Sequence, residues 1–295
     1  MTSPSTGPGP ADPAPGGARM GVGALLRQWR ERRRVSQLEL ALRADSSARH
    51  ISFVETGRAT PSRAMVLRLA EHLDVPVRDR NALLIAAGYA PAYPETPLHD
   101  PAMTAVRAGL EQLLTAYEPN PALVLDGHYD VALTNRAALV LLTGVPADLL
   151  RPPLNAMRLT LHPRGLAPRI VNLAEWRSHL LERMQRNMIL RGSPALRALH
   201  DEVSAYPVPD RPALNDPGAD TGPGSANPAA PSDGAPAALA LPMRIVVEGH
   251  LLTLISTMTT FNTPMDVTVS ELAVETFLPA DPETAKALAA LAEGR

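Results

Sequence analysis

The chain has 295 residues, of which 45% are hydrophobic, 20% charged and only 3% aromatic, a globular composition that suits two modest domains better than one large core. It contains no cysteine, which excludes a disulfide framework, a thiolate metal site and cysteine catalysis, and favours a cytoplasmic protein. The longest uncharged apolar run, 249–265, includes His, Asn, Ser and Thr and is too polar for a membrane span, so no membrane association is expected.

The charge is distributed unevenly along the chain. Residues 19–90 carry 13 Arg and no Lys against 7 Asp and Glu, whereas residues 91–295 carry 15 basic and 22 acidic side chains. A basic first part joined to an acidic remainder indicates nucleic-acid binding by the first part alone. The alternative interpretation is an Arg-rich surface that is merely solvated.

Two segments are rich in proline and glycine and have no hydrophobic periodicity. Residues 1–18 are expected to form a disordered tail, and residues 207–242 a disordered insert. These segments predict the domain organisation: a helical domain over 19–90, a linker over 91–100, and a second domain over 101–295 that the insert interrupts.

Five short helical patterns occupy residues 20–90. The first carries an apolar stripe of Val22, Leu25, Leu26 and Trp29 at helical spacing. Ser36 caps a second helix over 37–43, which is expected to bury Leu38, Ala41 and Leu42. Ser47 caps a third helix, which is expected to bury Ile51 and Val54 and to end at Gly57. Pro61 lies near the start of a fourth helix, and a fifth over 78–87 ends at Gly88. The pattern predicts a compact all-α domain.

Only residues 44–46 separate the second helix from the third, which is the shape of a helix-turn-helix whose second helix enters the major groove of DNA. This part of the chain resembles the Xre/Cro repressor-type helix-turn-helix. The resemblance lies in three segments: Ser-Gln-Leu-Glu-Leu-Ala at residues 36–41, residues 47–52, and Glu-Thr-Gly-Arg at residues 55–58 followed by Pro61. Asp45 stands at a turn position that is usually Gly in that family, and its short polar side chain tolerates the left-handed conformation.

The helix-turn-helix predicts two sets of DNA contacts. Exposed residues on the opening turns of the second helix are expected to read base edges, with Arg49 able to pair with guanine; these are Ser47, Ala48, Arg49, His50 and Ser52. Side chains on the flanking helices are better suited to phosphates, which set the register; these are Arg27, Arg30, Arg34, Gln37 and Arg58. Phe53 either packs against the neighbouring helix or stacks near a thymine.

The second domain alternates β-type runs with helices. The expected elements are strands at 121–126 and 129–134 around the turn Gly127-His128, a helix capped by Asn135, a helix over 168–190, strands at 243–248, 251–261 and 270–278 with Gly249-His250 as the first turn, and a terminal helix capped by Asp281. Such an order predicts an α+β domain in which one antiparallel sheet has helices on one face. It resembles the PAS-like sensor fold.

Taken whole, residues 20–280 resemble the MmyB-like family of bacterial transcription regulators. Besides the helix-turn-helix, the resemblance lies in residues 78–81 and 86–91, 161–163 with 172–176, and 259–261 with 263–264. It implies a regulator that joins an Xre-type helix-turn-helix to a PAS-like domain binding a hydrophobic ligand such as a fatty acid, without a cofactor or a metal.

Six residues are candidates for contact with such a ligand. Apolar cavities usually carry a few polar groups that orient the ligand. The wall residues are expected to be Trp176, Met184 and Met258, and the polar contacts Arg169, Asn172 and His179. Core packing is the competing interpretation for Trp176 and the methionines, and a solvent-facing position for Arg169.

Two other functions compete with that of a ligand-sensing regulator. The chain has no His-Glu-x-x-His, no Gly-x-Ser-x-Gly and no Gly-rich phosphate loop, and its eight His are scattered, so an enzyme is not expected. The alternative is a DNA-binding protein whose second domain binds a protein partner, as an antitoxin or scaffold does. Palindromic half-sites are usual for a helix-turn-helix, so a homodimer formed through the second domain is expected.

Overall fold

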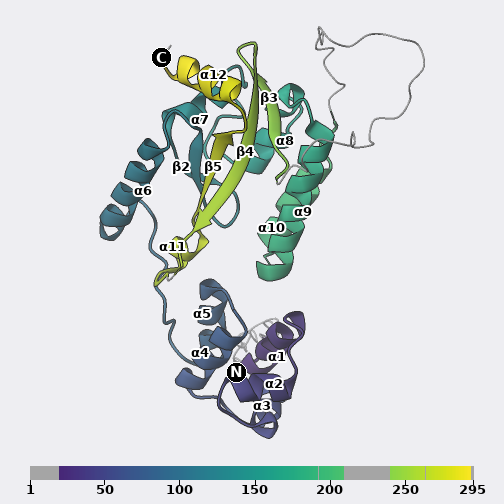
Figure 1. Ribbon diagram of the computed structural model, residues 1–295. Coiled ribbons are helices and arrows are strands. Elements are labelled where there is room, and N and C mark those ends of the chain that lie inside the picture. Colours follow the sequence, from purple (N-terminus) through teal and green to yellow (C-terminus); the bar gives the residue numbers. More distant parts are fainter. Residues whose placement is uncertain (1–19, 192, 209–239, 263, 294–295) are drawn as a thin grey trace, which may run out of the picture. The chain divides into compact units, whose positions relative to one another are not determined.

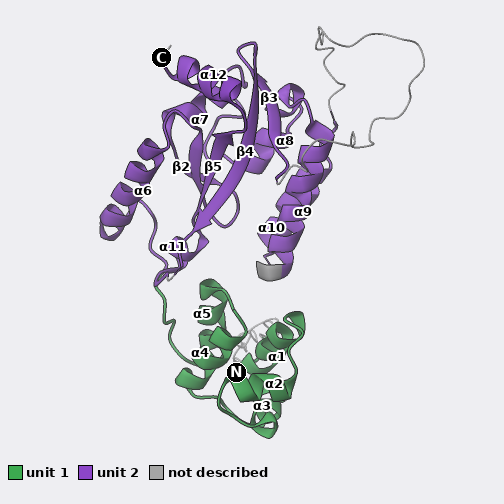
Figure 2. Cartoon of the chain, viewed as in Figure 1, with its two compact units in different colours: residues 1–94 green, residues 95–295 purple. Residues whose placement is uncertain are grey.

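The computed structural model describes residues 20–191, 193–208, 240–262 and 264–293. The predicted tail at 1–18 and most of the predicted insert at 207–242 lie outside these residues. The chain divides between Pro94 and Glu95 into two compact units, which are called unit 1 and unit 2 below (Figure 2). Within the described ranges, no helix is long and apolar enough to cross a membrane.

Unit 1 consists of five helices, as the sequence predicted (Figure 1). Ser36, Ser47 and Ser62 each accept a backbone N–H of the helix that follows, which satisfies a donor that the first turn leaves unpaired. Asp45 in the turn has a φ of 48° and is left-handed. The helices are α1 Val22–Arg32, α2 Gln37–Arg43, α3 Ala48–Glu55, α4 Arg63–His72 and α5 Val77–Ala86.

The core of unit 1 brings α1 onto α3 at very close range. A Cβ placed on Gly23 would lie 2.2 Å from the carbonyl oxygen of Val54, so this contact requires a glycine. On α2, Ala41 is buried as predicted, but Leu38 and Leu42 are exposed and Leu40 is buried in their place. The helix has only two turns, so its inner face is narrow. That face carries Leu40, Ala41 and the following Ala44, which pack together in the core of unit 1.

Unit 2 is an α+β domain built on one five-stranded antiparallel sheet, so the predicted fold class is confirmed. The strand order is β2-β1-β5-β4-β3. The pairing of β1 with β5 joins the two strands that precede the long helices to the three strands that follow them. Glu248 and Gly249 form the turn between β3 and β4, one residue before the predicted turn, because a two-residue hairpin loop of this type needs two left-handed residues. The strands are β1 Ala122–Leu125, β2 Val131–Thr134, β3 Met243–Val247, β4 His250–Thr260 and β5 Ala273–Pro279.

Helices cover both faces of this sheet, where one covered face was predicted. The larger core packs the sheet against α9 and α10, which lie side by side, through residues such as Leu125, Ile245 and Trp176. A second, smaller core packs Leu110 and Leu114 of α6 on the opposite face. The helices are α6 Thr104–Ala116, α7 Arg136–Leu141, α8 Ala156–Leu161, α9 Leu173–Arg191, α10 Pro194–Ser204, α11 Val267–Glu271 and α12 Pro282–Glu293.

Candidate functional site

The helix α3 presents its predicted base-reading residues in different ways. Arg49 is exposed, and its guanidinium lies 5.2 Å from the centre of the Phe53 ring, so the aromatic face supports it. The hydroxyl of Ser47 accepts the backbone N–H of His50 and caps the helix. Ala48, His50 and Ser52 are partly exposed, while Ile51 and Val54 are buried and anchor α3.

Two of the five residues predicted to contact phosphate take part in an internal network instead. Arg30 donates from Nε and Nη2 to the two carboxylate oxygens of Glu55, at 2.6 and 2.9 Å, and from Nη1 to the carbonyl of Val35 at 3.0 Å. Gln37 donates to Oε2 of the same carboxylate at 2.8 Å. The Arg30 side chain is only 12% exposed, and its bond to Glu55 raises the pKa of the guanidinium. Arg30 therefore ties α1 to α3 and is not placed for phosphate.

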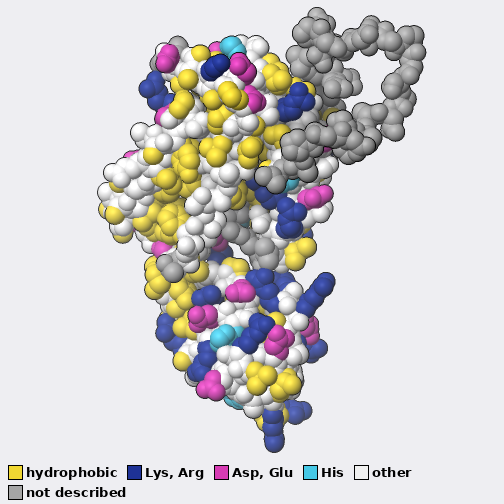
Figure 3. Space-filling model, viewed as in Figure 1, with side chains coloured by type: hydrophobic (Ala, Val, Ile, Leu, Met, Phe, Trp, Pro, Cys, Tyr) yellow, Lys and Arg dark blue, Asp and Glu magenta, His cyan; other side chains and the backbone are white. Residues whose placement is uncertain are grey.

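The other three arginines of this set lie at the surface of unit 1. Arg34 and Arg58 are exposed, and Arg27 forms an exposed ion pair with Glu31 one turn along α1. Figure 3 shows Lys and Arg side chains spread over unit 1 on the face in view, with acidic side chains between them. All three side chains are therefore at the surface, whereas Arg30 and Gln37 are held by Glu55.

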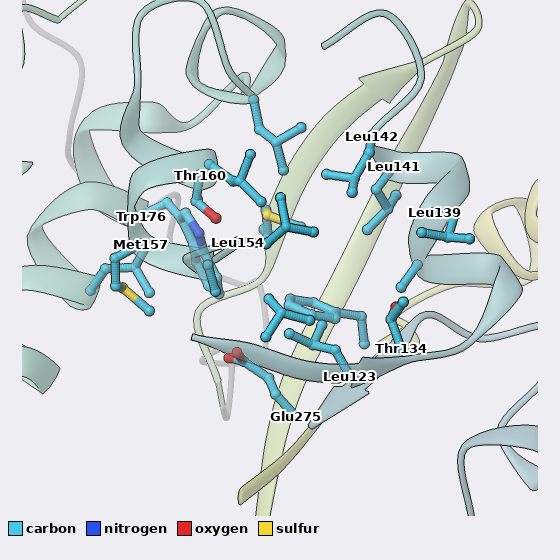
Figure 4. A pocket seen from close by; sticks show the side chains of 18 of the residues that line it. Leu123, Thr134, Leu139, Leu141, Leu142, Leu154, Met157, Thr160, Trp176 and Glu275 are labelled. Atoms are coloured by element: carbon cyan, nitrogen blue, oxygen red, sulfur yellow. The ribbon is translucent and has the colours of Figure 1, made fainter. Parts of the chain in front are cut away.

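Unit 2 contains an apolar cavity of about 90 Å³ between the sheet and the helices α7, α8 and α9. Trp176 of α9 and the leucines of α7 face each other across it (Figure 4). The wall is made almost entirely of aliphatic and aromatic side chains, including Leu123, Leu141, Leu142, Leu154, Met157, Leu159, Leu166, Trp176, Leu180, Met243 and Phe277. Its polar members are Thr134, Thr160, Arg183 and Glu275.

Arg183 and Glu275 form a buried ion pair at the cavity wall. Nη1 of Arg183 donates to Oε1 of Glu275 at 2.8 Å, and the two side chains are 16% and 4% exposed. Ser256 donates to the same oxygen at 2.8 Å, and the guanidinium lies 5.8 Å from the centre of the Tyr129 ring. Burial acts to lower the pKa of Arg183, but the attraction of Glu275 outweighs it and the pKa is raised.

Three buried N–H groups at this wall have no acceptor among the described residues. They are Nε and Nη2 of Arg183 and the indole Nε1 of Trp176. Buried polar groups in folded proteins are nearly always paired, since an unpaired buried donor costs about 1–3 kcal/mol. These three donors are enclosed by the wall itself and have almost no accessible surface.

Of the six residues predicted to contact a ligand, Trp176 lines the cavity and the other five do not. His179 stacks on the outer side of Trp176 with ring centres 5.5 Å apart, and burial lowers its pKa. Met184 is fully buried in the core, and Met258 is 41% exposed on β4. Sequence periodicity could not separate wall from core, because both positions carry apolar side chains.

Arg169 and Asn172 hold the backbone together. Arg169 donates to the carbonyls of Leu141 and Thr143, at 2.6 and 2.9 Å, where α7 ends. Asn172 donates to the carbonyl of Pro242 and accepts the backbone N–H of Arg244, both at 2.9 Å, which links the start of α9 to β3. These side chains bond backbone groups of neighbouring segments, and that use explains why they are polar.

Sequence reasoning missed the polar pair of the cavity, although a signal was present. Arg183 lies seven residues after Trp176 on the inner stripe of α9, and Glu275 lies in a β-type run between Val274 and Phe277. A charge on the inner stripe of each element indicates a buried ion pair. Their pairing spans 92 residues and could not be read from local spacing.

Comparison with protein families gives two matches. Residues 106–291 match a model described as the MmyB-like transcription regulator ligand binding domain. Residues 22–83 match a model described as a helix-turn-helix domain. No curated protein matches the chain. The first match alone spans more than half of the chain, and each match falls within one of the two units.

Proposed function

Because the chain belongs to the MmyB-like transcription regulators, which are DNA-binding proteins and not enzymes, we propose that a hydrophobic small molecule such as a fatty acid sets its affinity for an operator. The observation that carries this proposal is the apolar cavity in unit 2, which is walled by the sheet and by three helices. A cavity of this kind is typical of small-molecule sites, whereas a protein partner would need an extended apolar patch.

The operator is read by the exposed side of α3. Arg49 pairs with a guanine in the major groove, and its neighbours Ser47, Ala48, His50 and Ser52 complete the reading surface. Arg27, Arg34 and Arg58 contact phosphates, and these contacts make binding salt-dependent without adding sequence information. Gln37 reaches a phosphate only if its bond to Glu55 is shared or lost.

The size of the cavity limits the length of the ligand. An engineered cavity of about 150 Å³ holds a benzene molecule, so a volume of about 90 Å³ accommodates only the first few carbons of a chain. A longer chain must extend through the mouth of the cavity or displace the side chains of its wall. We therefore infer a medium-chain ligand, and decanoate is the probe used in the experiments below.

The regulator acts as a homodimer on two half-sites about one helical turn apart, as helix-turn-helix proteins usually do. Unit 2 supplies the dimer surface, since unit 1 has no heptad tail. A ligand in the cavity changes operator affinity only to the extent that it prefers one arrangement of the dimer over another.

The test is a titration of operator DNA by the full chain, with the operator obtained by selection from random sequences. Decanoate is expected to change the operator Kd by about 5-fold or more, within the usual range of allosteric coupling. Ala138→Leu, which fills the cavity from α7, should abolish the response, while Ala108→Leu on the exposed side of α6 should retain it. If decanoate binds and the operator Kd stays constant, the sensor proposal is wrong. Sedimentation of the same samples tests the dimer.

A further inference from the structure

The strand β4 is longer than its neighbour β3, and its second half borders no other strand on that side. Among the described residues, the pairing of β3 with β4 stops at Met243 opposite Leu254. Beyond Leu254, β4 continues to Thr260 and pairs with β5 alone (Figure 1). The side of Ser256–Thr260 that faces away from β5 is called the open edge below.

The main-chain groups of three residues point outward from the open edge. Thr253 accepts the N–H of Ala280 across the β4–β5 ladder at 2.8 Å, so its main-chain groups face β5. These groups alternate in direction along a strand, and the register with β5 is regular as far as Thr260. The N–H and C=O groups of Ser256, Met258 and Thr260 therefore face away from β5. No other described segment forms a main-chain hydrogen bond with them.

The two outer edges of the same sheet are covered by segments of the chain itself. At β2, Val131 donates its N–H to the carbonyl of Leu154 at 2.7 Å. At β3, Arg244 accepts the N–H of Val171 at 2.7 Å and donates its own N–H to the side chain of Asn172 at 2.9 Å. The open edge of β4 has no such cover among the described residues, so it differs from both.

The open edge also lacks the features that usually keep an edge strand from pairing. Residues 255–262 are Ile-Ser-Thr-Met-Thr-Thr-Phe-Asn, with no charge and no proline. Residues 257–262 are exposed, and Met258 and Phe261 are each 41% exposed. Natural proteins protect exposed edges with charges, prolines or bulges, and an edge without them is a template for another strand.

A second copy of the same segment fits the open edge without a mismatch. In an antiparallel pair with its two-fold axis at Met258, that residue lies opposite itself, and Ser256 lies opposite Thr260 of the second copy. All three outward-facing residues of each copy are then paired, through about six hydrogen bonds. An axis at any other residue leaves some of these groups beside β3 or past the end of β4. Because the segment is uncharged, no like charges meet across the axis.

We propose that two copies of this chain join through the open edges of β4, antiparallel and centred on Met258. This inference rests on the proposed function, which includes a homodimer on two half-sites, and it adds the surface of unit 2 that forms the dimer. The pairing is closed, because each copy uses its open edge on the other and the edges at β2 and β3 are covered. The assembly therefore stops at two copies.

The experiment uses the absence of cysteine, since one introduced thiol then reports on one position. Met258→Cys places two thiols across the axis with Cα atoms about 5.5 Å apart, which a disulfide can span. Thr260→Cys, which is equally exposed on the same strand, places them about 14 Å apart, which a disulfide cannot span. After mild oxidation of the full chain, a non-reducing gel should show a covalent dimer for Met258→Cys and a monomer for Thr260→Cys.

Sedimentation tests the main-chain bonds themselves. Met258→Pro removes an N–H that faces away from β5, and proline is tolerated at such positions of edge strands. It should raise the Kd of the dimer at least tenfold, whereas Met258→Val, which keeps the N–H, should change it by less than threefold. An unchanged melting temperature of the Met258→Pro monomer shows that unit 2 is folded.

The possible failures are distinguishable. A wild-type dimer in which Met258→Cys forms no disulfide, or in which Thr260→Cys forms one as readily, overturns this pairing and leaves a homodimer through another surface. A wild type that sediments as a monomer overturns both the pairing and the proposed homodimer, and leaves the open edge to a different protein. Neither result bears on the decanoate response of the operator Kd, which tests the sensor separately.

Discussion

Among the residues that the structure describes, a largely buried arginine–glutamate pair lies in unit 1 and another in unit 2, and the two pairs are built differently. In unit 1, Glu55 holds Arg30 with both oxygens and accepts a further bond from Gln37, while the remaining nitrogen of Arg30 donates to a backbone carbonyl. In unit 2, Glu275 holds Arg183 through one nitrogen, and two N–H groups are left unpaired. The first network is complete and the second is not.

The difference lies in what each pair does for its unit. A buried charge pair contributes most when every donor and acceptor is satisfied, and a partly satisfied network is costly. The complete pair joins α1 to α3, which positions the reading helix of a DNA-binding domain. The incomplete pair joins α9 to β5 at the wall of an apolar cavity.

The largest expected effect is on the complete pair. Glu55→Ala removes the carboxylate that pairs with the mostly buried charge of Arg30 and leaves it only the carbonyl of Val35 and a longer contact with Glu31, so unit 1 should lose about 3–5 kcal/mol of unfolding free energy. Urea denaturation followed by circular dichroism measures this loss. Glu39→Ala, in the exposed pair of α2 with Arg43, is the control and should cost about 0–1 kcal/mol. Equal losses in the two variants would show that the Arg30 network is not structural.

A smaller effect is expected when the charge of the incomplete pair is removed. Glu275→Gln keeps an acceptor for Arg183 but removes the negative charge, so unit 2 should lose about 1–3 kcal/mol. Decanoate should recover about 2.7 kcal/mol when present at 100 times its Kd. Thermal melts with and without decanoate test both statements, and a variant that melts as the wild type does would contradict the first of them.

The effect on operator reading is of similar size and belongs to unit 1 alone. Arg49→Ala should cost about 1–3 kcal/mol at one operator position and relax the base preference there. Arg58→Ala should weaken binding to all sequences alike, as loss of a phosphate contact does. Affinities for a panel of single-base operator variants distinguish the two. A uniform loss for Arg49→Ala would reassign that side chain to a phosphate.

The smallest effect is expected for an arginine–glutamate pair at the surface. Arg158 holds Glu202 through Nε and Nη2, but their side chains are 45% and 39% exposed. Solvent screens such a pair, so Arg158→Ala should change the unfolding free energy by only about 0–1 kcal/mol. Denaturation at low and high salt provides the measurement. A loss close to that of Glu55→Ala would mean that burial does not decide the strength of these pairs.

Local signals in the sequence predicted unit 1 better than unit 2. Serines at 36 and 47 and the glycines at 57 and 88 delimit helices by chemistry that acts within one turn. In unit 2 the strands and the caps at Asn135 and Asp281 were predicted, but α6 was not, and the second covered face of the sheet was therefore missed. Strand pairing depends on contacts between residues far apart in the sequence.

The two candidate sites show the same division. The exposed turns of α3 follow from helical periodicity, and Arg49 is predicted to read a base from its place in the motif. The bond of Arg30 was missed because its partner Glu55 lies 25 residues away, and the cavity residue Arg183 was missed because its partner lies 92 residues away. Only the folded arrangement shows which arginine has all its hydrogen bonds and which does not.

A crystal structure of the full chain with decanoate tests the central claim most directly. We expect the aliphatic chain of decanoate to lie in the cavity of unit 2 against Trp176, with the ion pair between Arg183 and Glu275 retained. Decanoate bound at the surface of unit 2, with the cavity empty, would contradict the account.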